Sequence, residues 1–272
     1  MYILVDIGAT KMRIAGSRDF ESFDDAVILD TPWTYEEGLG HITGISKNIA
    51  MDQKIEAIVL GVPAVLSHDR RTLRTLTNLP NWNNHELAAD LEKTLKTKAY
   101  LENDTALVGL GEATSGAGKG AVIVVYITVS TGVNGVRIVQ GIIDPSAYGF
   151  EIGYQLLFVE EAPRKWGDLI SGKSVSEKYG KHPRELGKDN PLWEELARLC
   201  AFGVHNSILH WSPDRIVLGG SMFNEIGISV ENVKKHLAEI MKAFPEVPEI
   251  VHSDLGDLGG LHGGIARLKQ LM

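Results

Sequence analysis

The chain has 272 residues, of which 44% are hydrophobic and 23% are charged, and its formal net charge is −8. This length suits two lobes of roughly 100–150 residues each, and the composition is that of an ordinary globular protein. A negative charge without a Lys- or Arg-rich stripe argues against a nucleic-acid partner, and no apolar run approaches the ~20 residues that cross a membrane. No signal-peptide pattern precedes the first strand, so we expect a cytoplasmic protein without a membrane partner.

Strand and helix patterns alternate through the first half of the chain. Apolar, β-branched runs predict strands at residues 2–7, 12–16, 56–60 and 98–101. A helix is predicted to begin at Asn84, its cap, and to carry leucines along one face. Another helix is predicted at residues 105–113, and the Gly-rich segment 115–120 is the expected connector between two domains.

The second half of the chain repeats this alternation. Strands are predicted at residues 122–128, 214–218 and 249–251. Helices are predicted at residues 173–179, 191–210, 230–244 and 259–271. Strands that alternate with helices after each hairpin indicate an α/β chain with mixed sheets.

One short segment occurs twice. Residues 5–14 read VDIGATKMRI, and residues 129–138, 124 positions later, read VSTGVNGVRI. Each copy follows an apolar run and predicts a β-hairpin whose turn carries small and hydroxyl residues. An ordinary hairpin turn has similar residues, but two such turns facing each other would offer N–H groups and hydroxyls to a polyphosphate. The pair therefore predicts a nucleotide cleft between two similar lobes.

The first turn carries the sharpest chemical signal. Gly8 permits close approach of the backbone to a phosphate, with Ala9 beside it, and Thr10 and Lys11 can donate hydrogen bonds to phosphate oxygens. Asp6, at the strand end, is placed to hold Mg²⁺ through water. The turn matches neither a Walker A loop nor a G-x-G-x-x-G fingerprint, which excludes P-loop and Rossmann folds.

The second turn has lost the carboxylate of the first. Ser130 stands in the place of Asp6, so Thr131 and Gly132 are left as the phosphate-binding residues. Asn134 follows closely, and Asn tolerates left-handed backbone angles, so we expect it to keep the turn.

Three further segments allow both a functional and a structural interpretation. Asp104 follows Asn103 at a strand end, where it could accept a proton from a substrate hydroxyl, a step worth about 10²–10⁴-fold in rate, or cap its helix. Residues 219–221 (GGS) could let an adenine lie against the backbone or form an ordinary turn. The amide-rich segment 78–84 could bind sugar hydroxyls or be a turn before a helix.

Together these residues resemble the ROK family (repressors, open reading frames and kinases) of sugar kinases, within the superfamily of actin, hexokinase and heat-shock ATPases. The resemblance runs in order over nearly the whole chain. It is carried by residues 6–11, 61–64, 77–82, 102–104, 130–135, 149–153, 171–173, 218–221 and 254–264. Several ordered motifs at family spacing are much more specific than any single one.

The resemblance implies an α/β fold of two duplicated ribonuclease H-like lobes, the actin-like ATPase fold, with the nucleotide cleft between them. The N-terminal lobe would comprise residues 1–117, joined by the C-terminal helix 259–272, and the nucleotide-binding lobe residues 118–258. The resemblance further implies ATP-dependent phosphorylation of a hexose or hexose derivative, with ATP and Mg²⁺ as cofactors, in a chain that forms a homodimer.

The resemblance also assigns roles to single residues. Asp104 would be the general base that takes the proton from the sugar hydroxyl. The sugar would be bound by Ala64, Thr77, Asn78, Asn103, Asp104, Glu151, Tyr154 and Asp168. ATP would be bound by Asp6, Gly8, Ala9, Thr10, Lys11, Thr131, Gly132, Gly219, Gly220 and Ser221, with Asp6 also holding Mg²⁺ through water.

The sequence departs from the family around the sugar. Tyr154 replaces a family His that touches the sugar and commonly binds zinc, and the family's cysteine cluster is absent, because Cys200 is the only cysteine. We therefore expect no zinc site, and we expect packing of Trp166 to stabilise that region instead. Gly167 replaces a second sugar-binding Glu. Either the shorter Asp168 substitutes for it through a shifted backbone, or this contact is lost.

Two functions remain open. The favoured one is an ATP-dependent sugar kinase with a specificity unlike that of standard glucokinases. The alternative is a catalytically weak or inactive ROK-type protein that binds sugar or nucleotide, and the retention of Asp6 and Asp104 argues against it. A repressor of the family would need an N-terminal helix-turn-helix, and none is expected because the first phosphate turn begins at Asp6.

Overall fold

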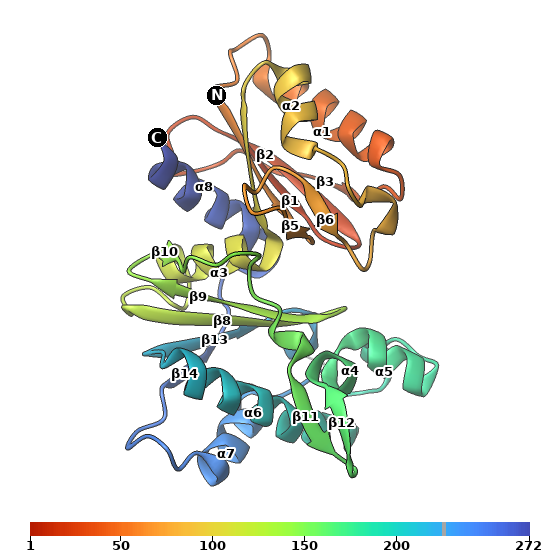
Figure 1. The fold of residues 1–272 in the computed structure, drawn as a ribbon, viewed down its shortest axis with the longest axis vertical. Helices are drawn as coiled ribbons and strands as arrows, with labels where there is room; N and C mark the ends of the chain where they lie inside the picture. The colour runs from red at the N-terminus through yellow and green to blue at the C-terminus, as the bar shows by residue number, and fades with distance from the viewer. Residues whose placement is uncertain (225–226) are drawn as a thin grey trace. The chain divides into compact units, whose positions relative to one another are not determined.

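The computed structural model describes residues 1–224 and 227–272, and the chain divides into two compact units (Figure 1). Unit 1 consists of Met1–Thr114, Pro145–Gly149 and Asp257–Met272, and unit 2 consists of Ser115–Asp144 and Phe150–Gly256. Unit 1 is therefore assembled from three separate stretches of the sequence.

The core of unit 1 is a five-stranded mixed sheet. Its strand order is β3-β2-β1-β4-β7. The strands are β1 (Tyr2–Ile7), β2 (Lys11–Ser17), β3 (Val27–Asp30), β4 (Ala57–Val62) and β7 (Lys98–Asn103). The first three are antiparallel, whereas β1, β4 and β7 run parallel. Because the carboxyl ends of parallel strands meet at one edge, Asp6 lies opposite Gly61, and Gly61 lies opposite Glu102.

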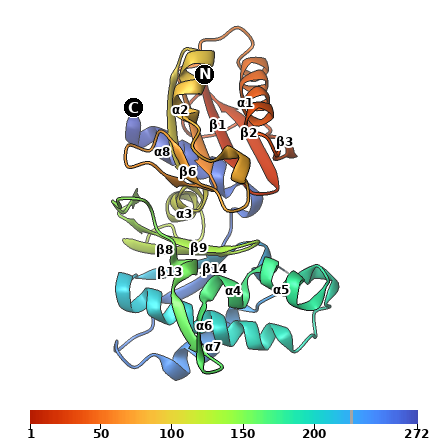
Figure 2. The ribbon, with the colours of Figure 1, turned by 45° about the vertical axis from the view of Figure 1, so that its right-hand side comes forward.

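Helices cover both faces of this sheet (Figures 1 and 2). One face packs against α1 (Tyr35–Ala50) and α2 (Leu87–Leu95), and the other against α3 (Asp104–Ser115) and α8 (Gly259–Leu271). Successive residues of β1 point to opposite faces, so Ile3, Val5 and Ile7 join the core under α1 and α2, and Leu4 joins the core under α3 and α8. A hairpin of β5 (Val65–Leu66) and β6 (Leu73–Thr75), followed by the short helix η1 (Pro80–Trp82), precedes α2.

Unit 2 repeats this topology. Its main sheet has the order β10-β9-β8-β13-β14. The strands are β8 (Ile123–Val129), β9 (Val133–Val139), β10 (Ile142–Ile143), β13 (Arg215–Gly219) and β14 (Glu249–His252). Again the first three are antiparallel, and β8, β13 and β14 are parallel. The two sheets therefore have the same connectivity, which explains the repeat in the sequence.

The other elements of unit 2 lie around this sheet. The apolar faces of α6 (Leu192–Trp211) and α7 (Val230–Ile240) pack into its core. The remaining elements are β11 (Leu156–Val159), β12 (Ala162–Lys165), α4 (Trp166–Ile170), α5 (Gly172–Tyr179), η2 (Ile152–Tyr154), η3 (Pro183–Glu185), η4 (Ser221–Phe223) and η5 (Gly256–Leu258), the last of which crosses the boundary between the units. Within the described ranges, no helix is both long enough and apolar enough to cross a membrane.

Most of the predicted elements are present, and the differences include the start of α2, the end of α7 and helix α1. The predicted cap residue Asn84 does not begin α2: its φ is 63°, its N–H donates to the carbonyl of Leu73, and the helix begins at Leu87. Helix α7 ends at Ile240, where Met241 adopts an extended backbone, and not at residue 244. The 16-residue helix α1 was not predicted at all.

Each unit has a fully buried tryptophan that packs onto a helical glycine. The indole of Trp82 donates to the carbonyl of Pro32 at 3.1 Å, and a Cβ on Gly38 of α1 would lie 2.1 Å from its Cζ2. In unit 2, Trp166 donates to the carbonyl of Leu199 at 3.2 Å, and a Cβ on Gly203 of α6 would lie 2.1 Å from its ring. The expected packing role of Trp166 is therefore confirmed, because its side chain is 0% exposed.

This packing predicts opposite effects for two glycines of the same helix. Gly38→Ala would force a methyl group against Trp82, so we expect the free energy of unfolding to fall by about 1–3 kcal/mol. Gly44→Ala, where no atom lies within 4 Å of the added Cβ, should raise it by about 0.5–1 kcal/mol through higher helix propensity. Urea unfolding of both variants checks this, and equal effects would contradict the packing.

Candidate active site

Two carboxylates approach each other at the carboxyl ends of the parallel strands in unit 1. A Cβ on Gly61 of β4 would lie 3.3 Å from Cα of Asp104 and 3.5 Å from Oδ1 of Asp6, so these two residues flank Gly61. On α8, a Cβ on Gly260 would lie 2.6 Å from Oδ1 of Asp6. Two glycines therefore leave the space that the carboxylate of Asp6 occupies.

Burial makes both carboxylates difficult to ionise, and at Asp6 the charge of Asp104 adds to this effect. Burial, followed by the charge of Asp104, raises the pKa of Asp6 to about 7, although Arg13 opposes the shift. Burial also raises the pKa of Asp104 to about 6, against the hydrogen bonds from Thr105. A cation that binds between or beside Asp6 and Asp104 would stabilise the ionised form of both carboxylates.

Arg13 is a neighbour of Asp6 that we did not predict. Its Nη1 lies 3.6 Å from Oδ2 of Asp6, and its Nη2 lies 3.4 Å from Oδ2 of Asp257. The signal was present in the hairpin: with β1 and β2 joined by a short turn, Asp6 pairs directly with Arg13 across the strands, and directly opposed residues share a face.

The predicted phosphate turn of unit 1 joins β1 to β2. Thr31 fixes its backbone, because the hydroxyl of Thr31 donates to the carbonyl of Gly8 at 2.8 Å and its N–H donates to the carbonyl of Thr10 at 3.0 Å. Ala9 lies between them and is half-buried, whereas Thr10 is exposed. Nζ of Lys11 lies 2.6 Å from Oδ1 of Asp30, so the lysine is engaged in an exposed ion pair.

The end of β7 places Asn103 and Asp104 at the start of α3. Oδ1 of Asn103 accepts from the N–H of Ala106 at 3.2 Å, so Asn103, and not Asp104, caps the helix. Oδ1 of Asp104 accepts from the N–H of Thr105 at 2.7 Å, and its Oδ2 makes no hydrogen bond to any described residue. One carboxylate oxygen of Asp104 is thus fixed and the other is left without a partner.

The hairpin loop is joined to this strand end. Nδ2 of Asn103 donates to the carbonyl of Ala64 at 3.3 Å, which brings these two predicted sugar-binding residues together. Thr77 and Asn78 lie exposed in the loop between β6 and η1. In the described part of the chain neither one bonds to Asn103 or Asp104.

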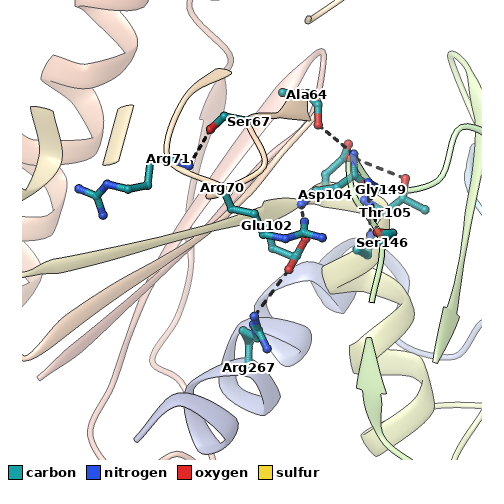
Figure 3. Close-up of polar contacts among 12 residues, drawn as sticks. Ala64, Ser67, Arg70, Arg71, Glu102, Asp104, Thr105, Ser146, Gly149 and Arg267 are labelled. Atoms are coloured by element: carbon teal, nitrogen blue, oxygen red, sulfur yellow. Dashed lines mark hydrogen bonds and ion pairs between the residues drawn. The ribbon is translucent and has the colours of Figure 1, made fainter. Parts of the chain in front are cut away.

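Glu102, directly before Asn103, is a buried acid that we did not predict as a site residue. Figure 3 shows it between Arg70, from the loop of the β5–β6 hairpin, and Arg267, from α8. Burial raises the pKa of Glu102, and the charge of Arg70 opposes this shift. In the sequence, the only signal for Glu102 is its place in the motif 102–104.

Three turns of unit 2 meet around Ser130. Its carbonyl accepts from the N–H of Gly172 at 2.7 Å, and its hydroxyl lies 3.1 Å from the hydroxyl of Ser221. Gly220 has a φ of +94°, and a Cβ there would lie 2.5 Å from the carbonyl oxygen of Val129, so this position requires glycine. The predicted nucleotide-binding segments of unit 2 are therefore neighbours.

Within this group, the β8–β9 turn itself is tight and exposed. The N–H of Ser130 donates to the carbonyl of Gly132 at 2.8 Å, and both Thr131 and Gly132 are exposed. A Cβ on Gly219 would lie 2.7 Å from the hydroxyl of Tyr126, so a side chain there would collide with the sheet. The expectation for Asn134 was wrong: it lies in β9 opposite Thr128 and is not among the described residues with positive φ.

The remaining predicted sugar-binding residues of unit 2 lie on η2 and α4. Glu151 directly precedes η2 and is exposed, and Asp168 is exposed on α4. Tyr154 is 53% exposed, with Nζ of Lys165 placed 4.5 Å from the centre of its ring. A Cβ on Gly167 would lie 3.3 Å from the carbonyl oxygen of Gly153, so η2 and α4 approach each other closely.

The residues around Asp6 suit a magnesium ion. No group of three or more His, Cys, Asp or Glu among the described residues is arranged to hold a metal by protein ligands alone. Mg²⁺ does not need such a group, since it keeps several waters and binds through one or two carboxylates and substrate phosphates. The raised pKa values of Asp6 and Asp104 are the effect that a divalent cation would reverse.

The raised pKa of Asp6 predicts how stability changes with pH. The folded chain holds this proton more tightly than the unfolded chain, so the associated stability is full below pH ~4 and is lost as the pH rises to about 7. Asp6→Asn removes this loss. Between pH 4 and 8, we expect the free energy of unfolding of the variant to rise relative to that of the wild type by up to about 4 kcal/mol. The cost of leaving Arg13 unpaired reduces the stability of the variant at every pH.

Thermal melts of both proteins at pH 4, 6 and 8 measure this difference, in which the other titrating groups cancel. A gap in melting temperature that stays constant across the three pH values would show that Asp6 ionises normally. Added Mg²⁺ should raise the melting temperature of the wild type at pH 8 and should leave that of Asp6→Asn unchanged.

Both the sequence and the structure of this chain are similar to those of known ROK proteins. The model of the ROK family matches residues 2–270. A fructokinase from Pediococcus pentosaceus is 25% identical over 205 residues, which are 70% of this chain and 71% of that protein. The structure is similar to a ROK hexokinase from Thermus thermophilus, with a TM-score of 0.85 and 22% identity over 99% of this chain and 98% of that one. It is also similar to a ROK family glucokinase from Streptomyces griseus in complex with glucose and AMPPNP, with a TM-score of 0.82 and 22% identity over 99% of each chain.

These similarities confirm the fold that the sequence predicted, two ribonuclease H-like lobes of the actin-like ATPase type. The match to the family model extends over nearly every residue, from β1 to α8. The chain belongs to the ROK family.

Proposed function

We propose that this chain is an ATP-dependent sugar kinase that transfers the γ-phosphoryl group of ATP to a hydroxyl of a hexose or hexose derivative. The observation that carries the proposal is the pair of carboxylates with raised pKa, Asp6 and Asp104, on either side of Gly61. The comparisons support it, since a relative is named a fructokinase and a structural neighbour was solved with glucose and AMPPNP.

Asp104 is the general base in this proposal. A base works best when its pKa lies near the working pH, and a pKa of about 6 leaves Asp104 ionised but still basic at pH 7. The hydrogen bond from Thr105 holds Oδ1, so Oδ2 can accept the sugar hydroxyl. As the sugar oxygen bonds to the γ-phosphorus, its proton passes to Asp104, and ADP leaves with the electrons of the broken P–O bond.

Each unit, taken by itself, contains residues proposed to bind ATP. In unit 1, the backbone of Gly8, Ala9 and Thr10 would bind phosphate oxygens, and Lys11 would exchange its exposed partner Asp30 for a phosphate. In unit 2, the phosphates would be bound by Thr131 and Gly132, and the adenosine by Gly219, Gly220 and Ser221. The anchoring of the first turn by Thr31 keeps its N–H groups in place before ATP arrives.

Asp6 would hold Mg²⁺ through water, and the ion would neutralise charge on the β- and γ-phosphate oxygens. The protein's own part is to orient this carboxylate. Arg13 contacts Asp6 from the neighbouring strand, and Gly260 gives it room beside α8. Asp6 is therefore held in one position before the substrates bind, which lowers the cost of organising the site.

The sugar would be bound by the loop and strand-end residues of unit 1 and by η2 and α4 of unit 2. These are Ala64, Thr77, Asn78, Asn103, Glu151, Tyr154 and Asp168. Tyr154 and Gly167 replace a His and a Glu of standard glucokinases, so we propose that the preferred sugar differs from glucose. The close approach of Gly167 to Gly153 leaves little room for a side chain at that position.

An ATP-consumption screen over hexoses, amino sugars and N-acetyl sugars tests this function. With the preferred sugar, Asp104→Asn should lower kcat by about 10²–10⁴-fold, because it removes the base and keeps the shape of the side chain. Asp52→Asn is the matched control, since Asp52 is exposed in a turn with a φ of 65° that Asn also tolerates.

Two outcomes would contradict the proposal. Turnover that survives unchanged in Asp104→Asn would remove Asp104 as the base. No turnover with any sugar, together with tight binding of ATP, would instead favour the catalytically weak alternative.

The raised pKa values also predict the acid side of the pH profile. The base must be ionised, so kcat/KM should fall as the pH drops through the range 7 to 6, where Asp6 and Asp104 take up protons in the free enzyme. For ordinary carboxylates the fall would come near pH 4. Initial rates from pH 4.5 to 9 distinguish the two, and full activity at pH 5 would show that burial does not raise the pKa of the base.

A further inference from the structure

A buried ion-pair cluster joins the β5–β6 hairpin to the end of β7 and to α8. Nη1 of Arg70 donates to Oε1 of Glu102, and Nη2 of Arg267 lies 3.9 Å from Oε2 of the same carboxylate. The side chain of Glu102 is 3% exposed, and those of Arg70 and Arg267 are about one quarter exposed. In Figure 3 the two arginines reach Glu102 from opposite sides.

The cluster connects directly to the residues that carry the chemistry. Oε1 of Glu102, which accepts from Arg70, also accepts from the N–H of Asn103 at 3.1 Å. One carboxylate oxygen therefore holds both the hairpin loop and the peptide that leads into Asp104. A displacement of Arg70 would leave a buried carboxylate with only its longer contact to Arg267 and the Asn103 N–H, an arrangement that favours rearrangement of the strand end.

The hairpin loop holds Arg70 in a defined position. Arg70 has a φ of 55°, an uncommon value for a residue with a Cβ. Its N–H donates to the carbonyl of Ser67 at 2.7 Å, and the hydroxyl of Ser67 accepts from the N–H groups of Arg71 at 3.1 Å and Thr72 at 2.9 Å. Ser67 therefore organises a tight loop from which the guanidinium of Arg70 reaches Glu102.

A second bond joins the same two segments. Nδ2 of Asn103 donates to the carbonyl of Ala64, at the start of the hairpin. The chain then runs through Arg70 and leaves the hairpin toward Thr77 and Asn78. The hairpin is thus tied to Asn103 once through its side chain and once through Glu102, so the loop and the strand end are held as one piece.

We propose that Arg70 is a positioning residue for phosphoryl transfer. It acts through Glu102 to hold Asn103 and Asp104 in a fixed position relative to the β5–β6 hairpin. This inference rests on the proposed sugar-kinase function. Arg70 would contact neither sugar nor ATP. Its effect would be on the placement of the sugar hydroxyl against Oδ2 of Asp104.

Steady-state kinetics of three variants test this role. Arg70→Met removes the charge and should raise the KM for the sugar about 10-fold and lower kcat about 10-fold, with the KM for ATP unchanged within 2-fold. Arg70→Lys keeps the positive charge and should recover most of the loss. Arg74→Met is the matched control, because Arg74 lies exposed on β6 of the same hairpin, and it should behave as the wild type.

A double variant separates positioning from loss of folded protein. If Arg70 acts through Glu102, then Arg70→Met combined with Glu102→Gln should be no worse in kcat/KM than the worse single variant. Multiplied effects would show that the two residues act separately and would overturn the proposal. A change of kcat alone, in proportion to the fraction of unfolded protein, would show a merely structural role and would also overturn it.

Amide hydrogen exchange distinguishes failure of this inference from failure of the proposed function. Exchange at residues 103–106 should be faster in Arg70→Met than in the wild type or Arg74→Met, whether or not a sugar is turned over. Unchanged exchange would overturn the link between Arg70 and the strand end. Faster exchange in a protein whose wild type phosphorylates no sugar would retain the link and reject the kinase role built on it.

Discussion

The burial of two neighbouring carboxylates, Asp6 and Asp104, is the constraint around which the candidate site of unit 1 is built. Two carboxylates withdrawn from water would ordinarily separate or take up protons. Here the register of β1, β4 and β7 fixes their backbones on either side of Gly61. Arg13 supplies one compensating charge. The fold therefore maintains an electrostatic arrangement that costs stability in the absence of substrates, as preorganised sites commonly do.

The end of β7 shows how environment separates acids that are neighbours in sequence. Glu102 is neutralised by arginines from two other elements, so its carboxylate is a fixed part of the structure. Asp104, two residues later, has no basic partner among the described residues and keeps one oxygen without a hydrogen bond. The same chemical group is structural in one case and available for chemistry in the other, and the difference lies in what the tertiary structure brings to each.

Local patterns were sufficient to predict the repeated hairpins and most other elements, because β-branched runs and small turn residues act over a few positions. Helix α1 escaped notice because three glycines (Gly38, Gly40 and Gly44) weaken its helical pattern, and the need for Gly38 arises from Trp82, which is distant in sequence. The prediction that Asn84 caps a helix was wrong for a similar reason. Its N–H donates a hydrogen bond to Leu73 of β6, and this tertiary contact sets its backbone conformation. The acids at 6 and 104 were predictable as motif residues, whereas the arginines that accompany Glu102 come from remote segments and have no local signature.

Unit 1 depends on α8, although its strands all lie in the first 103 residues. Leu261, Ile265 and Leu268 of α8 complete the apolar layer that includes Leu4 and Val59 on one face of the sheet. During synthesis from the N-terminus, that face has only α3 to cover it while the whole of unit 2 is made. Unit 2, whose residues are nearly contiguous, can complete its own core first. The N-terminal strands are thus made first but fully folded last, and until then they offer an apolar surface that chaperones would recognise.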